Sequence, residues 1–188
     1  MALSFTQHST GGGWAGGGSA PNCSDQQRTA VLALYENLKT CIAGSSCLGQ
    51  AMRDRIDSSP VEIDCGTNCG GAALSRSGSK ITVCDLRANN ANLYFARAIV
   101  RAAGLSGLDS FVVGATCFPG GVANPIGDPD WNTMKDGTSN QNNILWFGYF
   151  VVWNSETGQV FRRDGNNAGP LCFQSNDWRH VYPRGGWV

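Results

Sequence analysis

Two long stretches of the chain place apolar residues at helical spacing. In the first, residues 25–42, apolar side chains recur every three or four positions and so fall on one face of a helix. These positions are Val31, Leu34, Tyr35, Leu38 and Ile42. Ser24 precedes this stretch and Gln27 follows three residues later, a capping-box pattern that favours a helix start. The pattern predicts a helix over residues 25–42.

The second helical stretch covers residues 92–104. Its apolar stripe consists of Leu93, Ala96, Val100 and Ala103. Gly104 follows at the position where a left-handed residue ends many helices. Arg97 and Arg101 lie four residues apart, so their side chains leave the helix on the same face. Two like charges at this spacing repel by roughly 0.2–0.5 kcal/mol, so we expect a compensating group nearby.

Shorter patterns complete the predicted set of elements. We expect short helices at 48–56 and 108–114, and strands at 61–65 and 81–84. Residues 119–143 are rich in Gly, Pro, Asn and Asp and predict a long loop. Aromatic strands at 144–153 and 159–163 flank a turn at 154–158, which predicts a C-terminal β-hairpin. The order of elements indicates an α+β fold, with helices packed on a small sheet.

The same patterns suggest how the chain is divided. Residues 1–22 form a glycine-rich N-terminal arm, and residues 23–188 form a single α+β domain. Within that domain we expect a core at 24–118, the loop at 119–143 and the hairpin tail at 144–188. If the arm is ordered, a neighbouring subunit is the simplest support for it, with Trp14 as its anchor. Both faces of the first aromatic strand are apolar, so it packs either on the core helices or at a subunit interface, with Trp146, Tyr149 and Trp153 as interface candidates.

The middle of the chain carries a resemblance to a known family. A strand at 80–85 leads into the helix that ends at Gly104, and Asp109 and Cys117 follow. From Ser24 to Phe118 this order resembles the active-site region of the zincin metallopeptidases, especially the aspzincin-like branch. In that family the helix carries a His-Glu-x-x-His-x-x-Gly motif, whose two histidines bind zinc and whose glutamate is the general base. The resemblance implies that Asp109 stands at the position of the third zinc ligand.

The matching positions depart from the zincin motif. Arg97 and Arg101 replace the two histidines, and Ala98 replaces the glutamate. Arginine does not lose its proton in proteins and cannot coordinate a metal. The resemblance therefore implies a zincin-like fold without its zinc, and we predict no cofactor. Three interpretations of Arg97, Arg101 and Asp109 stay open: an arginine–aspartate ion pair in the volume of the metal, two solvated arginines beside a helix-capping aspartate, or an anion-binding site.

Composition limits the possible partners. The 14 basic and 14 acidic residues give a formal net charge of zero, so no basic surplus exists to attract nucleic acid. The chain has no run of about eighteen apolar residues, which argues against insertion into a membrane. Only 15% of its residues are charged, and a near-zero net charge favours association between copies. Residues 1–20 lack the charged and apolar regions of a secretory signal, so we expect export by another route or release as part of a particle.

Eight cysteines point to disulfide bonds in an oxidising environment. They are Cys23, Cys41, Cys47, Cys65, Cys69, Cys84, Cys117 and Cys172. Free buried thiols and a metal cluster remain alternatives, although the chain contains no Cys-x-x-Cys pair. The spacing alone favours short-range pairs, Cys41 with Cys47 and Cys65 with Cys69.

Other catalytic patterns are weak. His8 and His180 are the only histidines, and they lie far apart in the sequence. His180 could join a triad with Asp177 or Asp130, but no Gly-x-Ser-x-Gly motif supports it. Asp128 and Asp130 could hold calcium, but they lack the EF-hand spacing. The chain has no phosphate-binding or dinucleotide-binding glycine motif.

These observations favour a non-catalytic function. We expect a structural or binding subunit that self-associates or docks into an extracellular or virion-like assembly. One alternative is an active secreted hydrolase, either a peptidase with displaced ligands or a toxin. Another is a small carbohydrate- or peptide-binding module that uses the loop around Trp131.

Overall fold

The computed structural model describes residues 3–9, 19–67, 69–88, 90–118, 145–154, 159–164 and 167–174. In this part of the chain the helices are α1 (Asp25–Gly44), α2 (Gly49–Ser58), α3 (Ala91–Ala102) and α4 (Gly107–Cys117). The strands are β1 (Leu3–Phe5), β2 (Gln7–Ser9), β3 (Ser19–Pro21), β4 (Val61–Cys65), β5 (Leu74–Ser77), β6 (Lys80–Val83), β7 (Leu145–Phe147), β8 (Val151–Asn154), β9 (Gln159–Asp164) and β10 (Asn167–Gln174). The predicted α+β class is confirmed.

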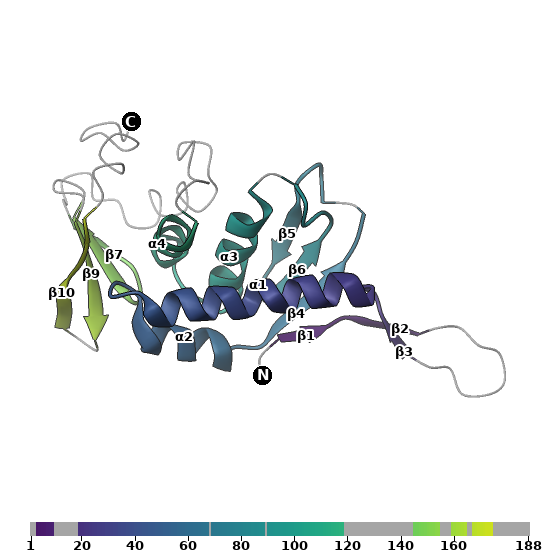
Figure 1. Ribbon diagram of the computed structural model, residues 1–188, viewed down its shortest axis with the longest axis horizontal. Helices are drawn as coiled ribbons and strands as arrows, with labels where there is room; N and C mark the ends of the chain where they lie inside the picture. Colours follow the sequence, from purple (N-terminus) through teal and green to yellow (C-terminus); the bar gives the residue numbers. More distant parts are fainter. Residues whose placement is uncertain are drawn as a thin grey trace.

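Helix α1 runs along the length of the molecule, and the other elements are arranged around it (Figure 1). One sheet, in the order β1-β4-β6-β5, lies along one half of α1, and helices α3 and α4 lie between this sheet and the second one. The second sheet, in the order β10-β9-β8-β7, lies at the end where α1 finishes. The ribbon of β2 and β3 projects from the opposite end. The second sheet and the β2–β3 ribbon therefore lie at opposite ends of α1.

Helix α1 begins and packs as its sequence predicts. The Ser24 hydroxyl accepts the backbone N–H of Gln27, and the Gln27 side chain accepts the backbone N–H of Ser24. This capping box satisfies N–H groups that the first turn would otherwise leave unpaired. Val31, Leu38 and Ile42 are buried along one face, as the periodicity requires. The helix extends two residues past the predicted end.

The core sheet is mixed. Strands β1, β4 and β6 run parallel to one another, and β5 is antiparallel to β6. Val61 and Ile63 of β4 point into the core, while Glu62 between them is partly exposed, which is the alternation of a half-buried strand. The strands predicted at 61–65 and 81–84 are observed, the second shifted by one residue. Strand β5 was not predicted, because its sequence, Leu-Ser-Arg-Ser, is mostly polar and exposed.

Composition predicts a glycine-rich arm at residues 1–22, but parts of this stretch form strands. Strand β1 pairs with β4, Leu3 lying opposite Val61 and Phe5 opposite Ile63, so it forms the edge of the core sheet. Strands β2 and β3 then pair with each other as a separate two-stranded ribbon. The high glycine content of residues 1–22 is typical of a flexible linker, so the sequence did not predict these strands. Trp14 lies outside the described residues.

The aromatic tail also differs from its prediction. Residues 144–153 were expected to form one strand, but the structure contains two, β7 and β8, which pair antiparallel around a tight turn at 148–150. The backbone N–H of Gly148 donates to the carbonyl of Val151 across this turn, at 2.8 Å. Strand β9 then pairs antiparallel with β8. The loop 119–143 lies outside the described residues.

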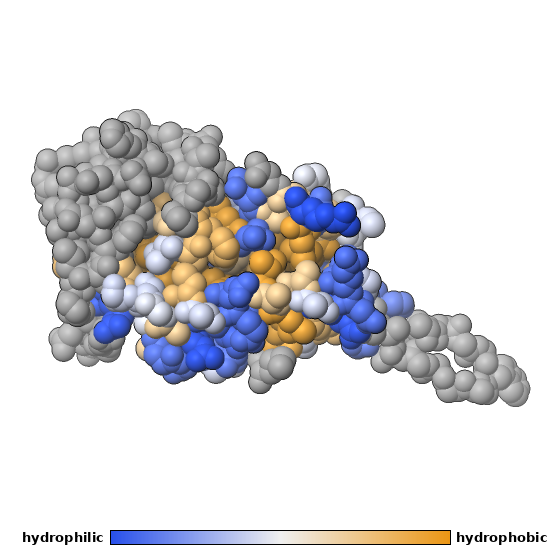
Figure 2. Space-filling view, in the orientation of Figure 1, coloured by the Kyte–Doolittle hydropathy of each residue, from blue (hydrophilic) through white to orange (hydrophobic). Residues whose placement is uncertain are grey.

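The surface separates by polarity. Figure 2 shows hydrophilic residues over α2 and apolar residues across the middle of the same face, in the region of α3 and α4. Helix α4 is buried on all sides, every residue from Gly107 to Ala115 having little or no exposed surface. None of the described helices is long and apolar enough to cross a membrane.

Candidate functional site

The positions that resemble a zincin site lie on two adjacent helices. Arg97, Ala98 and Arg101 are on α3, and Asp109 is in the first turn of α4. Gly104 joins the helices and has a φ of +79°, the left-handed conformation expected at a helix end. The sequence therefore placed these four residues correctly on their elements.

Arg97 belongs to the packing between α3 and α4. Its side chain is only 4% exposed. The guanidinium carbon lies 5.3 Å from the centre of the Phe111 ring, within the range of a cation–π contact. A Cβ atom on Gly114 would come within 2.8 Å of Arg97 Nε and 2.7 Å of Leu93 Cδ1, so only glycine lets α4 approach α3 this closely. Arg97 therefore lies between two packed helices and not in an open site.

Arg101 occupies a more exposed position one turn later. Its Nη1 donates a hydrogen bond to the carbonyl oxygen of Leu105, at 3.0 Å. Leu105 lies in the connection between α3 and α4, just past the left-handed Gly104. This hydrogen bond satisfies a carbonyl just past the end of α3, the helix that carries Arg101. It is the kind of contact by which a basic side chain supports a helix terminus.

Asp109 is fully buried and accepts hydrogen bonds at both oxygens. Oδ2 accepts from the hydroxyl of Ser106 at 2.6 Å and from the Ser106 backbone N–H at 3.2 Å, which completes a capping box at the start of α4. Oδ2 also accepts the backbone N–H of Tyr149 at 2.6 Å, and Oδ1 accepts that of Phe150 at 2.8 Å. One carboxylate thus caps its own helix and holds a turn about forty residues away in the sequence.

This geometry bears on two of the three interpretations of the cluster. The partners of Asp109 in the described part of the chain are Ser106, Tyr149 and Phe150, and no guanidinium group is among them. Asp109 is therefore a helix-capping aspartate, as one interpretation held, but that interpretation also placed both arginines in solvent, and Arg97 is buried. The interpretation as an arginine–aspartate ion pair gains no support from these contacts, in which the donors to the carboxylate are backbone N–H groups and the Ser106 hydroxyl.

A zinc ion does not fit these residues. Two of the three family ligand positions carry guanidinium groups, which remain protonated. The carboxylate of Asp109 already has both oxygens occupied by donors. Within the described ranges, no group of three or more His, Cys, Asp or Glu side chains is arranged to hold a metal. His8 lies in β2, and His180, Asp177, Asp128, Asp130 and Trp131 lie outside the described residues.

The cysteines form disulfides, but with longer spans than expected. Cys23 is bonded to Cys65, Cys41 to Cys117 and Cys69 to Cys84. Both predicted short-range pairs are therefore wrong. Cys41 lies in the last turn of α1 and Cys117 in the last of α4, and helix packing brings them together in a way that spacing cannot show.

The other two cysteines complete the comparison with the prediction. Cys47 is also disulfide-bonded. Cys172 is in β10, and its side chain lies outside the described part of the structure.

One interface candidate is clearly accessible. Tyr149, in the turn held by Asp109, is 62% exposed and lies 5.3 Å from the ring of Phe150. Trp146 and Trp153 are cross-strand partners in β7 and β8, and their side chains lie outside what the structure describes. The other large hydrophobic residue with high exposure in the described part is Tyr94 on α3, at 43%.

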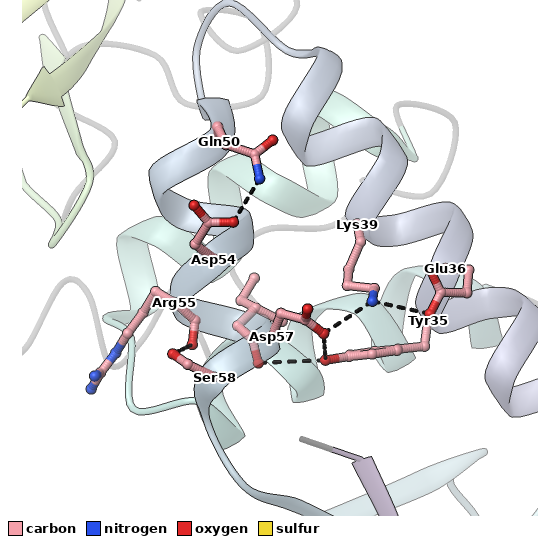
Figure 3. A network of polar contacts seen from close by, with 9 residues as sticks. Tyr35, Glu36, Lys39, Gln50, Asp54, Arg55, Asp57 and Ser58 are labelled. Atoms are coloured by element: carbon pink, nitrogen blue, oxygen red, sulfur yellow. Dashed lines mark hydrogen bonds and ion pairs between the residues drawn. The ribbon is translucent and has the colours of Figure 1, made fainter. Parts of the chain in front are cut away.

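A second polar cluster connects α1 and α2 (Figure 3). Lys39 is buried, and its Nζ lies 3.0 Å from Asp57 Oδ1 and 3.0 Å from Glu36 Oε1. The ammonium group also lies 4.7 Å from the centre of the Tyr35 ring. The Tyr35 hydroxyl donates to the Ile56 carbonyl or to Asp57, both at 3.4 Å. The cluster satisfies a buried cation from both helices, which is what keeps a buried charge tolerable.

Electrostatics in this cluster follow from burial and pairing. Burial, followed by the nearby charge of Asp57, raises the pKa of Tyr35 to about 12. Burial alone lowers the pKa of Lys39, but hydrogen bonds to Asp57 and Glu36 raise it above its usual value. The hydrogen bond from Lys39 lowers the pKa of Asp57. Lys39 is therefore held as a cation and is not a nucleophile or base.

Comparisons of the chain with protein-family models, with curated proteins and with solved structures find no match. Interpretation of the site therefore depends on its own chemistry.

Proposed function

We propose that this protein is a non-catalytic structural or binding subunit, built on a scaffold that resembles that of the zincin peptidases. The observation that carries the proposal is the use of Asp109. At the position where the resemblance implies a zinc ligand, the carboxylate caps α4 and binds the turn of residues 148–150. A side chain committed to four structural hydrogen bonds is not available for a metal or for proton transfer.

The proposed setting is an extracellular or virion-like assembly. The bonded cysteines support an oxidising environment. The ribbon of β2 and β3 supports a role in assembly, because an isolated two-stranded ribbon is marginally stable in water and gains stability from a neighbouring surface. The net charge of zero also favours contact between copies.

Two measurements test this function. Elemental analysis of natively purified protein, without added zinc, is expected to find far less than one zinc per chain. Zinc near one per chain would overturn the non-catalytic interpretation and return the alternative of a hydrolase with unconventional ligands. Incubation with an unfolded protein substrate, with and without a chelator, provides the matching activity control, and no turnover is expected in either sample.

Light scattering tests the assembly. At micromolar concentration we expect a species heavier than the 20.0 kDa chain. A variant that lacks residues 6–21, which joins β1 to Asn22 without the ribbon, is expected to shift the distribution toward the monomer. A full-length protein that is monomeric at all concentrations would refute self-association and leave docking to a different partner as the remaining form of the proposal.

A further inference from the structure

One carboxylate connects two distant parts of the described chain. Asp109 is 0% exposed, and the backbone N–H groups of Tyr149 and Phe150 donate to its two oxygens at 2.6 and 2.8 Å. Hydrogen bonds to an ionised acceptor are about twice as strong as those between neutral groups. The turn that these two hydrogen bonds hold connects β7 to β8. In Figure 1, β7 lies on the side of its sheet that is next to α4.

The contact is shaped so closely that glycine is required beside it. A Cβ atom on Gly148 would lie 2.7 Å from Asp109 Oδ1 and 3.1 Å from Ser106 Oγ. A real Cβ does not approach an oxygen this closely, so any larger residue moves the turn away from the carboxylate. The contact therefore requires both the carboxylate of Asp109 and a glycine at position 148.

Next to this contact the strand covers an apolar surface. Val151 and Val152 at the start of β8 are buried, and Phe111, Val112 and Val113 of α4 have no exposed surface. Apart from Asp109 and Ser110, α4 presents no charged or strongly polar side chain between Gly107 and Ala115. Displacing the turn would expose to water the part of α4 that lies against β8.

The helical core has its own covalent supports. The three described disulfides join Cys23 to Cys65, Cys41 to Cys117 and Cys69 to Cys84, all between residues 23 and 117. Cys41–Cys117 fixes the end of α4 to the end of α1. Residues 23–117 are therefore restrained even when the turn at 148–150 is not in place.

A buried carboxylate makes this contact a two-state element. An ionised group is tolerated out of water only with its donors in place, and a partly opened contact leaves the charge neither hydrogen-bonded nor hydrated. Intermediate positions of the turn are therefore disfavoured. The turn is either docked on Asp109, or far enough away for water to reach the carboxylate.

We propose that Asp109 is a latch for the β7–β8 segment, residues 145–154. With the latch closed, the segment covers α4 and holds Tyr149 in a fixed position in solvent. With the latch open, the turn at 148–150 lifts away from α4 and exposes the part of α4 beneath it, while β8 stays paired with β9 and the disulfide-bonded core stays folded. The latch does not depend on the function proposed above.

Hydrogen exchange measured by mass spectrometry on the full, disulfide-intact chain tests the latch. In Asp109→Asn one oxygen is replaced by a donor that faces other donors, so the turn opens more often. Exchange of the Tyr149 and Phe150 amides is expected to be at least about tenfold faster than in wild type, because a hydrogen bond to a charged group contributes at least that factor to a local equilibrium. Exchange in α1 is expected to be unchanged.

Two further variants make the test decisive. Gly148→Ala leaves the carboxylate and Ser106 intact but displaces the turn, and is expected to give the same local increase. Asp57→Asn, the same chemical change in the α1–α2 cluster, is expected to raise exchange in α1 and α2 and not at residues 145–154. Unchanged exchange at the turn in both latch variants would overturn the proposal. So would a uniform increase over the whole chain, or failure of both latch variants to fold, since either result means that the turn does not open separately.

Discussion

Alkaline pH should weaken the fold through Tyr35, and the size of the effect follows from its surroundings. Tyr35 is buried at the interface of α1 and α2, beside the carboxylate of Asp57, and its pKa is raised to about 12. In the unfolded chain its pKa is about 10. Because the folded-state value is the higher one, the stabilisation is complete below pH 10 and is lost as the pH rises toward 12.

The magnitude can be worked out from these two values. Between them the unfolded chain releases a proton that the folded chain keeps, and each pH unit changes the free energy of unfolding by about 1.4 kcal/mol. The loss is therefore about 1.4 kcal/mol at pH 11 and about 2.3 kcal/mol at pH 12. Lys39 contributes in the same direction, since its pKa is also raised and its pairing is lost at alkaline pH.

A matched variant separates the two residues. Tyr35→Phe keeps the ring over Lys39 and removes only the hydroxyl, whose two alternative acceptors each lie at a long 3.4 Å. At pH 8 this variant is expected to be less stable than wild type by no more than about 1 kcal/mol. Urea unfolding followed by far-ultraviolet circular dichroism, from pH 8 to pH 11 without thiols, should show wild type losing its advantage and becoming the less stable protein near pH 11.

A direct readout is available as well. Phenolate absorbance at 295 nm reports all four tyrosines of the chain. The component that titrates last should disappear in Tyr35→Phe. A constant difference in unfolding free energy between the two proteins from pH 8 to pH 11 would refute the argument, since it would mean that Tyr35 ionises equally easily in the folded and unfolded chains.

Three further sets of variants test the packing of α3 on α4, the cap of α1 and one disulfide. Gly114→Ala places a Cβ 2.7 Å from Leu93 Cδ1 and should destabilise the fold by about 1–3 kcal/mol through overpacking, measured by thermal unfolding; an unchanged melting temperature would show that α3 and α4 are not in close contact there. Ser24→Ala removes the capping hydroxyl of α1 and should lower stability by about 1 kcal/mol, whereas Ser24→Asp should retain most of it. The double variant Cys41→Ser/Cys117→Ser opens a closed loop with a sequence separation of 76 and should lower the free energy of unfolding by about 4–5 kcal/mol, seen in urea; a loss below about 1 kcal/mol would contradict the expected restraint on the unfolded chain.

Local signals predicted the elements of the core well. The capping box at Ser24 and the stripe that includes Val31 and Leu38 are properties of neighbouring residues, and α1 forms where they place it. Gly104 likewise ended α3 where its backbone freedom suggested. These features depend on interactions within one or two turns, which the sequence displays directly.

Features that depend on distant contacts could not be predicted in the same way. The pairing of β1 with β4 joins residues almost sixty positions apart, and nothing in Leu3-Ser4-Phe5 identifies its partner. The true partner of Cys41 depended on how α1 and α4 pack. The apolar residues of 144–153 predicted one continuous strand. The turn at Gly148 was missed because apolar residues continue on both sides of it.

The candidate site shows the same division. The spacing of Arg97 and Arg101 correctly predicted a shared helix, and the Ser106–Asp109 spacing is a capping-box signal that could have been read from the sequence. The contact of Asp109 with the turn at 148–150 has no sequence signature. Donation by a backbone N–H depends on where the turn lies and not on which side chains it carries.

The parallel pairing of β1 with β4 has a consequence for how the chain folds as it is made. The N-terminal strand cannot find its position in the sheet until the residues that face it, Val61 to Ile63, have been synthesised. Two helices form in the interval, and the disulfide from Cys23 to Cys65 closes beside the same junction. Non-local pairings of this kind slow folding, because loop closure must precede the contacts that reward it. During synthesis β1 therefore stays without its sheet partner until β4 has been made.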